Sequence, residues 1–173
     1  MRQLERAASN DIDSLMEAAG LAVARRINQL LGGVRGKRLL TLVGSGNNGG
    51  DGMVAARYLS DWGALVTLYL TSTKRREDKL EECRIRRVNI MDARDDKEQV
   101  ALTTYLPLTD LVIDAVLGIG HNRPFDGMLR DLFATLSEAK RMHPELKLVA
   151  LDVPSGMDAD DGSIDEAIPK MDI

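Results

Sequence analysis

Three segments of this chain combine glycines with polar side chains that could bind or transform a small molecule. They are GSGNNGGDG at residues 44–52, DAVLGIGHNRPFDG at 114–127 and DVPSGMDADDG at 152–162. Glycines let a backbone approach a ligand closely and direct its N–H groups at a phosphate. Asn47 and Asn48 add carbonyl oxygens and amide donors, which suit a cation or a polar ring. The segments therefore predict a site for a polar, phosphorylated ligand.

Two carboxylates follow apolar runs and are expected at the ends of buried strands. Asp114 ends the run LVID and Asp152 ends LVALD. A carboxylate in such a position must be paired, hydrogen-bonded or bound to a cation. Pro154 and Gly156 form a sharp turn that would bring Ser155 toward the same cleft. We expect desolvation to raise the pKa of Asp152 toward the range useful for acid–base catalysis.

Alternating helical and strand patterns supply the elements that would position these groups. Such alternation predicts a Rossmann-like, three-layer α/β/α fold with a mainly parallel sheet. Ligands of such folds bind beyond the carboxyl ends of the strands, which is where all three segments lie. Asp51 is the expected N-cap of the helix that follows the glycine segment. We expect strands at 38–43, 64–70, 87–91, 110–116 and 146–153, and helices at 1–9, 11–31, 51–62, 73–87, 95–105 and 127–141.

Composition and charge narrow the class of protein. The 173 residues, 44% hydrophobic and 29% charged, fit one soluble globular domain spanning 1–173. A formal net charge of −4 gives no general attraction to nucleic acid or to anionic membranes. No apolar run reaches the roughly 20 residues of a membrane span. The single cysteine, Cys83, lies on a charged helix that we expect to be exposed, and it fits a reducing, cytoplasmic location.

The glycine segment also matches the G-x-G-x-x-G pattern of dehydrogenases, at Gly44, Gly46 and Gly49. Those enzymes need an acidic residue at the end of the second strand to hold the ribose hydroxyls. Here the second strand ends at Leu70, and no carboxylate follows before Glu77. A hydride-transfer site is therefore disfavoured.

A serine hydrolase is disfavoured as well. Ser155 lies in the order Val-Pro-Ser-Gly rather than G-x-S-x-G. Only His121 and His143 could serve as its base, and His143 lies in a connection that precedes a strand. By itself His121 is no evidence of a site, and Arg123 fits a phosphate ligand as well as a surface ion pair.

Taken together, the segments resemble the NAD(P)HX epimerase family, also called the YjeF N-terminal domain. The matching pieces are LMEAAG at 15–20, GSGNNGGDGMVAARYL at 44–59, DAVLGIGHNRPFDG at 114–127 and LDVPSGMDADDG at 151–162. The resemblance implies a Rossmann-like homodimer that interconverts R- and S-NADHX and R- and S-NADPHX, which are hydrated at C6 of the nicotinamide ring. It also implies functional coupling to an ADP- or ATP-dependent dehydratase.

The resemblance further implies roles for individual residues. Asp152 would face the reacting ring as the catalytic residue. A potassium ion would be bound by Asn48, Asp114 and Ser155. The substrate would be contacted by Asn47, Asn48, Gly49, Gly50, Asp51 and Asp152, and its phosphates would be enclosed by Gly118, Ile119, Gly120, His121, Asn122, Arg123 and Pro124.

The C-terminal end departs from the family pattern. The chain ends in DEAIPKMDI where the family continues with further strands, so we expect a sheet short of one or more C-terminal strands. A non-catalytic nucleotide-binding or protein-interaction module of the same fold remains the alternative function, and the preference between NADHX and NADPHX stays open.

Overall fold

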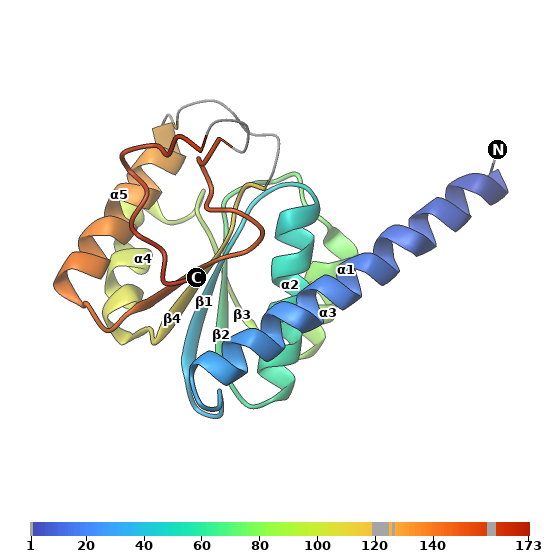
Figure 1. Cartoon of the computed structure of the whole chain (residues 1–173), viewed down its shortest axis with the longest axis horizontal. Helices are drawn as coiled ribbons and strands as arrows, with labels where there is room; N and C mark the ends of the chain where they lie inside the picture. Colours follow the sequence, from blue (N-terminus) through green and yellow to red (C-terminus); the bar gives the residue numbers. More distant parts are fainter. Residues whose placement is uncertain (1, 119–124, 126, 159–161) are drawn as a thin grey trace.

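The computed structural model describes residues 2–118, 125, 127–158 and 162–173. Its five-stranded sheet has the order β3-β2-β1-β4-β5, and every neighbouring pair of strands is parallel. This arrangement confirms the expected parallel α/β architecture (Figure 1). The strands are β1 (Arg38–Val43), β2 (Leu65–Leu70), β3 (Asn89–Asp92), β4 (Leu111–Ala115) and β5 (Lys147–Ala150).

Helices cover both faces of this sheet. On one face α1 packs on α2 and α2 packs on α3, while α4 and α5 cover the other face (Figure 1). The side chains of β1 alternate between these layers, with Leu39 and Val43 facing α1–α3 and Leu40 and Leu42 facing α4–α5. The helical segments are α1 (Arg2–Leu30), α2 (Asn47–Asp61), α3 (Glu77–Ile85), η1 (Lys97–Gln99), α4 (Val100–Tyr105), η2 (Leu106–Leu108) and α5 (Gly127–Met142).

Two helix boundaries differ from the sequence expectation. α1 is one continuous helix, without the break expected near residue 9. α2 begins at Asn47 rather than Asp51, and its N-cap is Gly46 at φ 90°, with no capping bond from a side chain. Asp51 therefore lies one turn inside the helix, and the prediction that it is the N-cap is wrong. The two asparagines belong to the first helical turn instead of a loop.

The charged helix α3 is not exposed throughout, contrary to expectation. Lys79, Leu80 and Cys83 are buried at three- and four-residue spacing, which places them on one face of the helix. The thiol of Cys83 donates a hydrogen bond to the carbonyl oxygen of Met53 on α2, at 3.3 Å. Burial raises the pKa of this thiol to about 12. Cys83 is therefore a core residue.

The C-terminal residues run along the outer edge of β5. Asp172 N donates to Leu148 O at 2.7 Å, and Ala150 N donates to Ile173 O at 2.8 Å. The Asp172 carboxylate also accepts a bond from Leu148 N, at 2.9 Å. β5 itself ends at Ala150, earlier than expected. The segment that ends the chain forms hydrogen bonds with its outer edge.

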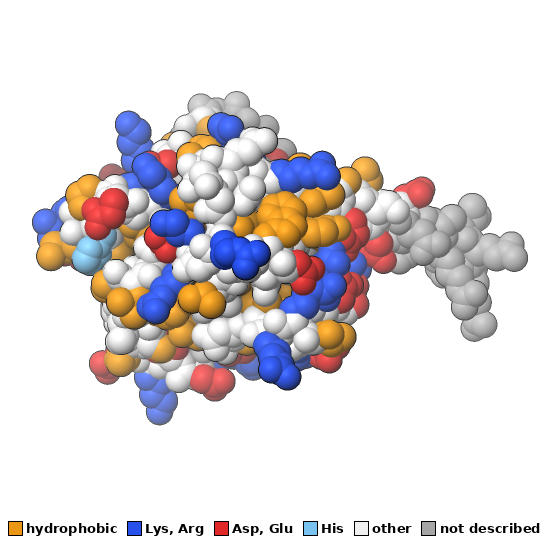
Figure 2. Space-filling view, turned by 90° about the horizontal axis from the view of Figure 1, so that it is seen from below, with side chains coloured by type: hydrophobic (Ala, Val, Ile, Leu, Met, Phe, Trp, Pro, Cys, Tyr) orange, Lys and Arg blue, Asp and Glu red, His pale blue; other side chains and the backbone are white. Residues whose placement is uncertain are grey.

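The surface carries mixed charge. On the face shown in Figure 2, basic and acidic side chains are interspersed, with apolar side chains between them. This face therefore presents no extended field of a single sign. Among the described helices, none has the length and apolar character needed to cross a membrane.

Candidate functional site

A cleft of about 610 Å³ opens at the carboxyl edge of the sheet, beyond the ends of β1, β4 and β5. The strand order reverses between β1 and β4, and such a switch point is where open α/β sheets bind ligands. The cleft collects residues that are distant in sequence. Its lining consists of Ala19, Val23, Ser45, Gly46, Asn47, Asn48, Asp51, Gly118, Leu151 and Asp152.

Asp51 is a cleft carboxyl group whose pKa the environment raises toward neutral pH. It is half-buried in the second turn of α2. Burial, together with the negative charge of Asp152 in the same cleft, raises the pKa of Asp51 to about 6. A carboxyl group that titrates near neutral pH can hold and release a proton during a reaction. The sequence predicts that Asp51 contacts the substrate, but it does not predict the raised pKa.

Asp152 lies two residues beyond the end of β5. Its backbone has φ 72°, a left-handed conformation in which Asp and Asn are among the better tolerated residues. The side chain is exposed, so the expected desolvation of this carboxylate is wrong. Its Oδ2 lies within 3.3 Å of the position that a Cβ on Gly118 would occupy, so a side chain there would crowd the carboxylate. Glycine at residue 118 therefore leaves room for the Asp152 carboxylate in the cleft.

Asp114 lies near the carboxyl end of β4, between β1 and β5, and is buried, with 1% of its surface exposed. Its carboxylate accepts bonds from the Ser155 hydroxyl at 2.6 Å, from Ser155 N at 2.8 Å and from Val116 N at 3.2 Å. Burial raises the pKa of Asp114, and these hydrogen bonds offset part of the effect. The expected convergence of Asp114 and Ser155 is therefore present in the structure.

Asn48 extends the same network. Its amide nitrogen donates to Leu117 O at 2.7 Å, and that carbonyl lies 3.2 Å from the Ser155 hydroxyl oxygen. The bond to Leu117 O orients the side chain, because a flipped amide would place two oxygens against each other. Asn48 Oδ1 is buried and accepts no hydrogen bond from any described residue. A buried acceptor without a donor is unfavourable unless a ligand or ion satisfies it.

The other residues expected at the site fall into two groups. Gly49 and Gly50 are buried beneath the cleft, and a Cβ on Gly50 would lie 2.5 Å from Met16 Cε. They allow close packing and are not part of the cleft lining. Ile119, Gly120, His121, Asn122, Arg123 and Pro124, which were expected to enclose phosphates, lie outside the described residues.

Helix α1 also contributes to the site, which the sequence does not predict. Ala19 and Val23 line the cleft from the helix that precedes β1. The available signal was the segment LMEAAG, which was recognised as a matching motif but given no role. Small apolar residues on a helix are usually taken as packing residues, so the pattern alone did not point to a ligand.

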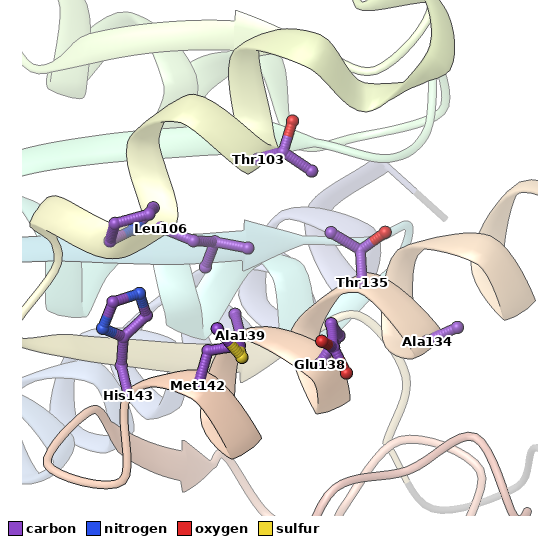
Figure 3. Close-up of a pocket in the computed structure, with 9 residues that line it drawn as sticks. Thr103, Leu106, Ala134, Thr135, Glu138, Ala139, Met142 and His143 are labelled. Atoms are coloured by element: carbon purple, nitrogen blue, oxygen red, sulfur yellow. The ribbon is translucent and has the colours of Figure 1, made fainter.

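A second cavity, of about 390 Å³, lies between α4–η2 and α5 (Figure 3). Leu106, Ala134, Ala139 and Met142 make most of it apolar. It lies away from the carboxyl-edge segments and contains one carboxylate, Glu138, whose pKa is lowered by a hydrogen bond from Arg141. We place the candidate active site in the carboxyl-edge cleft because it contains two carboxylates, Asp51 and Asp152, and the unsatisfied Asn48 oxygen.

Comparison with known proteins identifies the family of this chain. Residues 12–173 match the family model described as YjeF-related protein N-terminus. An NAD(P)H-hydrate epimerase of Entamoeba histolytica is 33% identical over 162 residues, covering 92% of this chain and 66% of that relative. A bifunctional NAD(P)H-hydrate repair enzyme of Pyrobaculum aerophilum is 39% identical, covering 89% of this chain and 30% of that relative.

A solved structure supports the same assignment of fold. The crystal structure of the yeast protein ynu0 superposes with a TM-score of 0.79 at 26% identity, covering 92% of this chain and 68% of that one. The chain spans less than two thirds of the length of the curated relatives described above.

Proposed function

We propose that this chain, which belongs to the family described as YjeF-related protein N-terminus, interconverts the R and S epimers of hydrated NADH and NADPH. The observation that carries the proposal is the pair of carboxylates, Asp51 and Asp152, in one cleft at the switch point of the sheet. The names of the relatives from Entamoeba histolytica and Pyrobaculum aerophilum support the substrate. The missing acid after β2 argues against hydride transfer.

The proposed chemistry needs both an acid and a base. C6 of the hydrated ring carries a hydroxyl group and is bonded to the ring nitrogen. Inversion requires the bond from C6 to oxygen or to nitrogen to break and reform. If the bond to nitrogen breaks, a base accepts the hydroxyl proton, C6 becomes an aldehyde, and an acid protonates the nitrogen. The ring closes again when the nitrogen attacks the opposite face of the aldehyde. This step returns both protons, so no oxidant is consumed.

The two carboxyl groups are suited to divide these tasks. The raised pKa of Asp51 favours its protonated form, which makes it the acid. Asp152 then serves as the base that accepts the hydroxyl proton. Because the return step reverses the roles, each group ends the cycle in its starting state.

We further propose that a monovalent cation, potassium by resemblance to the family, is bound by Asn48, Asp114 and Ser155. The donor set fits a hard cation, since it offers amide, carboxylate and hydroxyl oxygens. The unsatisfied Asn48 Oδ1 and the buried Asp114 carboxylate both favour a positive charge nearby. When bound, the ion would supply that positive charge.

Three further properties are proposed by the same resemblance. The chain works as a homodimer in the cytoplasm, and its product is consumed by a dehydratase that uses ADP or ATP. The name of the relative from Pyrobaculum aerophilum, a bifunctional repair enzyme, supports coupling to a second repair reaction.

The proposal is tested by incubating the purified chain with R-NADHX or R-NADPHX, excess S-specific dehydratase and ATP. We expect recovery of reduced nucleotide absorbance at a rate at least about a hundredfold above that without the chain, the scale of acid–base catalysis. A rate equal to that of the dehydratase alone would refute the proposed function.

A further inference from the structure

The segment LMEAAG on α1 has no role in the proposed chemistry, although it packs directly beneath the cleft. Met16 is buried against Gly50 of α2. A Cβ on Gly20 would lie 2.5 Å from Val54 Cγ1 and 2.9 Å from Asp51 O, so only glycine allows α1 to approach α2 this closely. α1 is thereby held against the same turn of α2 that carries Asp51.

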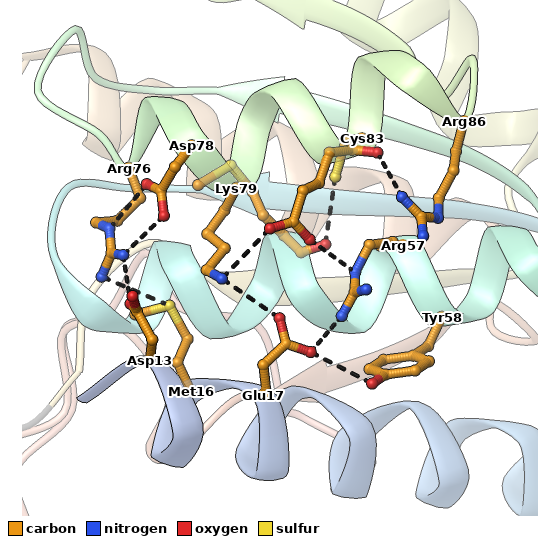
Figure 4. Close-up of polar contacts among 12 residues, drawn as sticks. Asp13, Met16, Glu17, Arg57, Tyr58, Arg76, Asp78, Lys79, Cys83 and Arg86 are labelled. Atoms are coloured by element: carbon orange, nitrogen blue, oxygen red, sulfur yellow. Dashed lines mark hydrogen bonds and ion pairs between the residues drawn. The ribbon is translucent and has the colours of Figure 1, made fainter. Parts of the chain in front are cut away.

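Glu17 connects α1 to both neighbouring helices (Figure 4). Its carboxylate accepts a charged hydrogen bond from Arg57 and a bond from the Tyr58 hydroxyl at 3.3 Å, both on α2. It also accepts a bond from Lys79 of α3, at 3.3 Å. Lys79 is buried and only 12% of the Arg57 side chain is exposed, whereas 32% of the Glu17 side chain is, so solvent screens these contacts only in part. The position of α1 is therefore fixed by charge as well as by close packing.

This placement gives the cleft an apolar surface. Ala19 and Val23 are four residues apart, which places them on one face of α1, and Leu151 adds to the same lining. The remaining lining is largely polar and includes Asp51 and Asp152. A reduced, hydrated nicotinamide ring is uncharged and has hydrocarbon faces, so one of its faces suits this surface. Contact with this apolar surface would keep bulk water from that face of the ring while the carboxyl groups transfer protons.

We propose that Ala19 and Val23 form the surface on which the substrate's hydrated nicotinamide ring packs, and that Glu17 and Gly20 are positioning residues for this surface. The inference rests on the proposed function, because it takes its ligand from there. The small side chain of Ala19 sets the room available to the ring, which makes it a determinant of substrate fit.

The test compares Ala19→Leu with Ala22→Leu, the same substitution on the exposed side of α1. The readouts are the thermal midpoint, the affinity for NADPH by calorimetry and the KM for R-NADPHX. We expect Ala19→Leu to weaken NADPH binding and raise KM by about tenfold or more, because overfilling a packed space is costly. Ala22→Leu should change neither quantity, and both variants should melt near the wild type.

The outcomes separate this inference from the proposed function. An active wild type with an Ala19→Leu variant of unchanged affinity and KM would overturn the inference alone. A wild type that neither binds NADPH nor epimerises R-NADPHX would refute the proposed function, and the inference with it.

Glu17 supplies an independent arm. We expect Glu17→Ala to raise the KM several-fold while kcat stays near the wild-type value, because the variant displaces a binding surface and leaves the carboxylates in place. Glu17→Gln keeps one acceptor oxygen, which can serve Arg57 or Lys79 but not both because these two side chains bond to different carboxylate oxygens, so it should restore part of the affinity. If Glu17 only stabilised the fold, Glu17→Ala would lower the thermal midpoint without raising KM at constant kcat. An unchanged KM in folded Glu17→Ala would contradict the positioning role.

Discussion

Replacing Asp51 with asparagine should make the protein more stable and much less active. The carboxylate is half-buried and shares its cleft with Asp152, and both features disfavour its charge. Asparagine keeps the shape of the side chain and removes the charge. It cannot hold or release a proton, so we expect epimerisation to fall about 10²- to 10⁴-fold.

The size and pH dependence of the stability gain follow from the pKa of Asp51. A carboxyl pKa of about 6 against an ordinary 3.8 corresponds to about 3 kcal/mol at 1.4 kcal/mol per pH unit. Solvent reaching the half-buried group reduces this to roughly 1–2 kcal/mol. Because the folded-state pKa is raised, the folded protein loses stability as pH rises toward 6 and bears the full cost above it. The gain from asparagine should therefore be largest above about pH 7 and shrink as pH falls from 6 toward 3.8.

The assay is urea unfolding of the wild type and Asp51→Asn at several pH values, alongside epimerisation rates. Asp131→Asn serves as the matched control, since Asp131 is an exposed carboxylate on α5, away from the cleft. We expect the control to change neither stability nor rate by a comparable amount. A variant that is less stable than the wild type at pH 8, or one that keeps near-normal turnover, would refute the reasoning about Asp51.

Four further outcomes are expected. Asp152→Asn should lose about 10²- to 10⁴-fold in activity while keeping its fold and nucleotide affinity, because asparagine tolerates φ 72°; activity that falls only in step with the thermal midpoint would make its role structural. The thermal midpoint should be higher in potassium chloride than in tetramethylammonium chloride, and equal midpoints would count against an ion bound by Asn48, Asp114 and Ser155. A thiol reagent should modify Cys83 only after denaturation, given its burial and a pKa of about 12, and rapid labelling of the native protein would contradict that environment. Incubation with NAD⁺ and small alcohols or hydroxy acids should yield no steady NADH absorbance; sustained reduction would reinstate a dehydrogenase.

The parallel fold was predictable because strands buried on both faces leave continuous apolar runs bounded by turns. All five strands were expected within a few residues of their observed bounds. The start of α2 was not predictable from propensity, because its first turn, NNGG, contains residues that disfavour helices. Tertiary contacts overrule that preference, since Gly50 packs against Met16 from a helix some 30 residues earlier.

The same limitation applies to α3. Its sequence EDKLEECRI is dominated by charge, and charge suggested exposure. The side chains that decide its packing are Leu80 and Cys83, three residues apart and fully buried. The long charged side chains around them bond to one another and to α1 and α2, so charged residues here surround a buried face.

The carboxylates show most clearly what local sequence leaves undetermined. Asp114 and Asp152 both follow short apolar runs, and the sequence therefore suggested similar, partly buried environments. β4 lies between β1 and β5, so Asp114 has a strand on each side and Ser155 closes over it. β5 is one of the two edge strands of the sheet, and Asp152 lies beyond its end, where solvent reaches it. Burial instead raises the pKa of Asp51, to about 6, and the sequence predicted this residue only as a helix cap and a substrate contact. Strand order and the approach of α1 set these environments, so the proposed division of acid and base between Asp51 and Asp152 rests on topology.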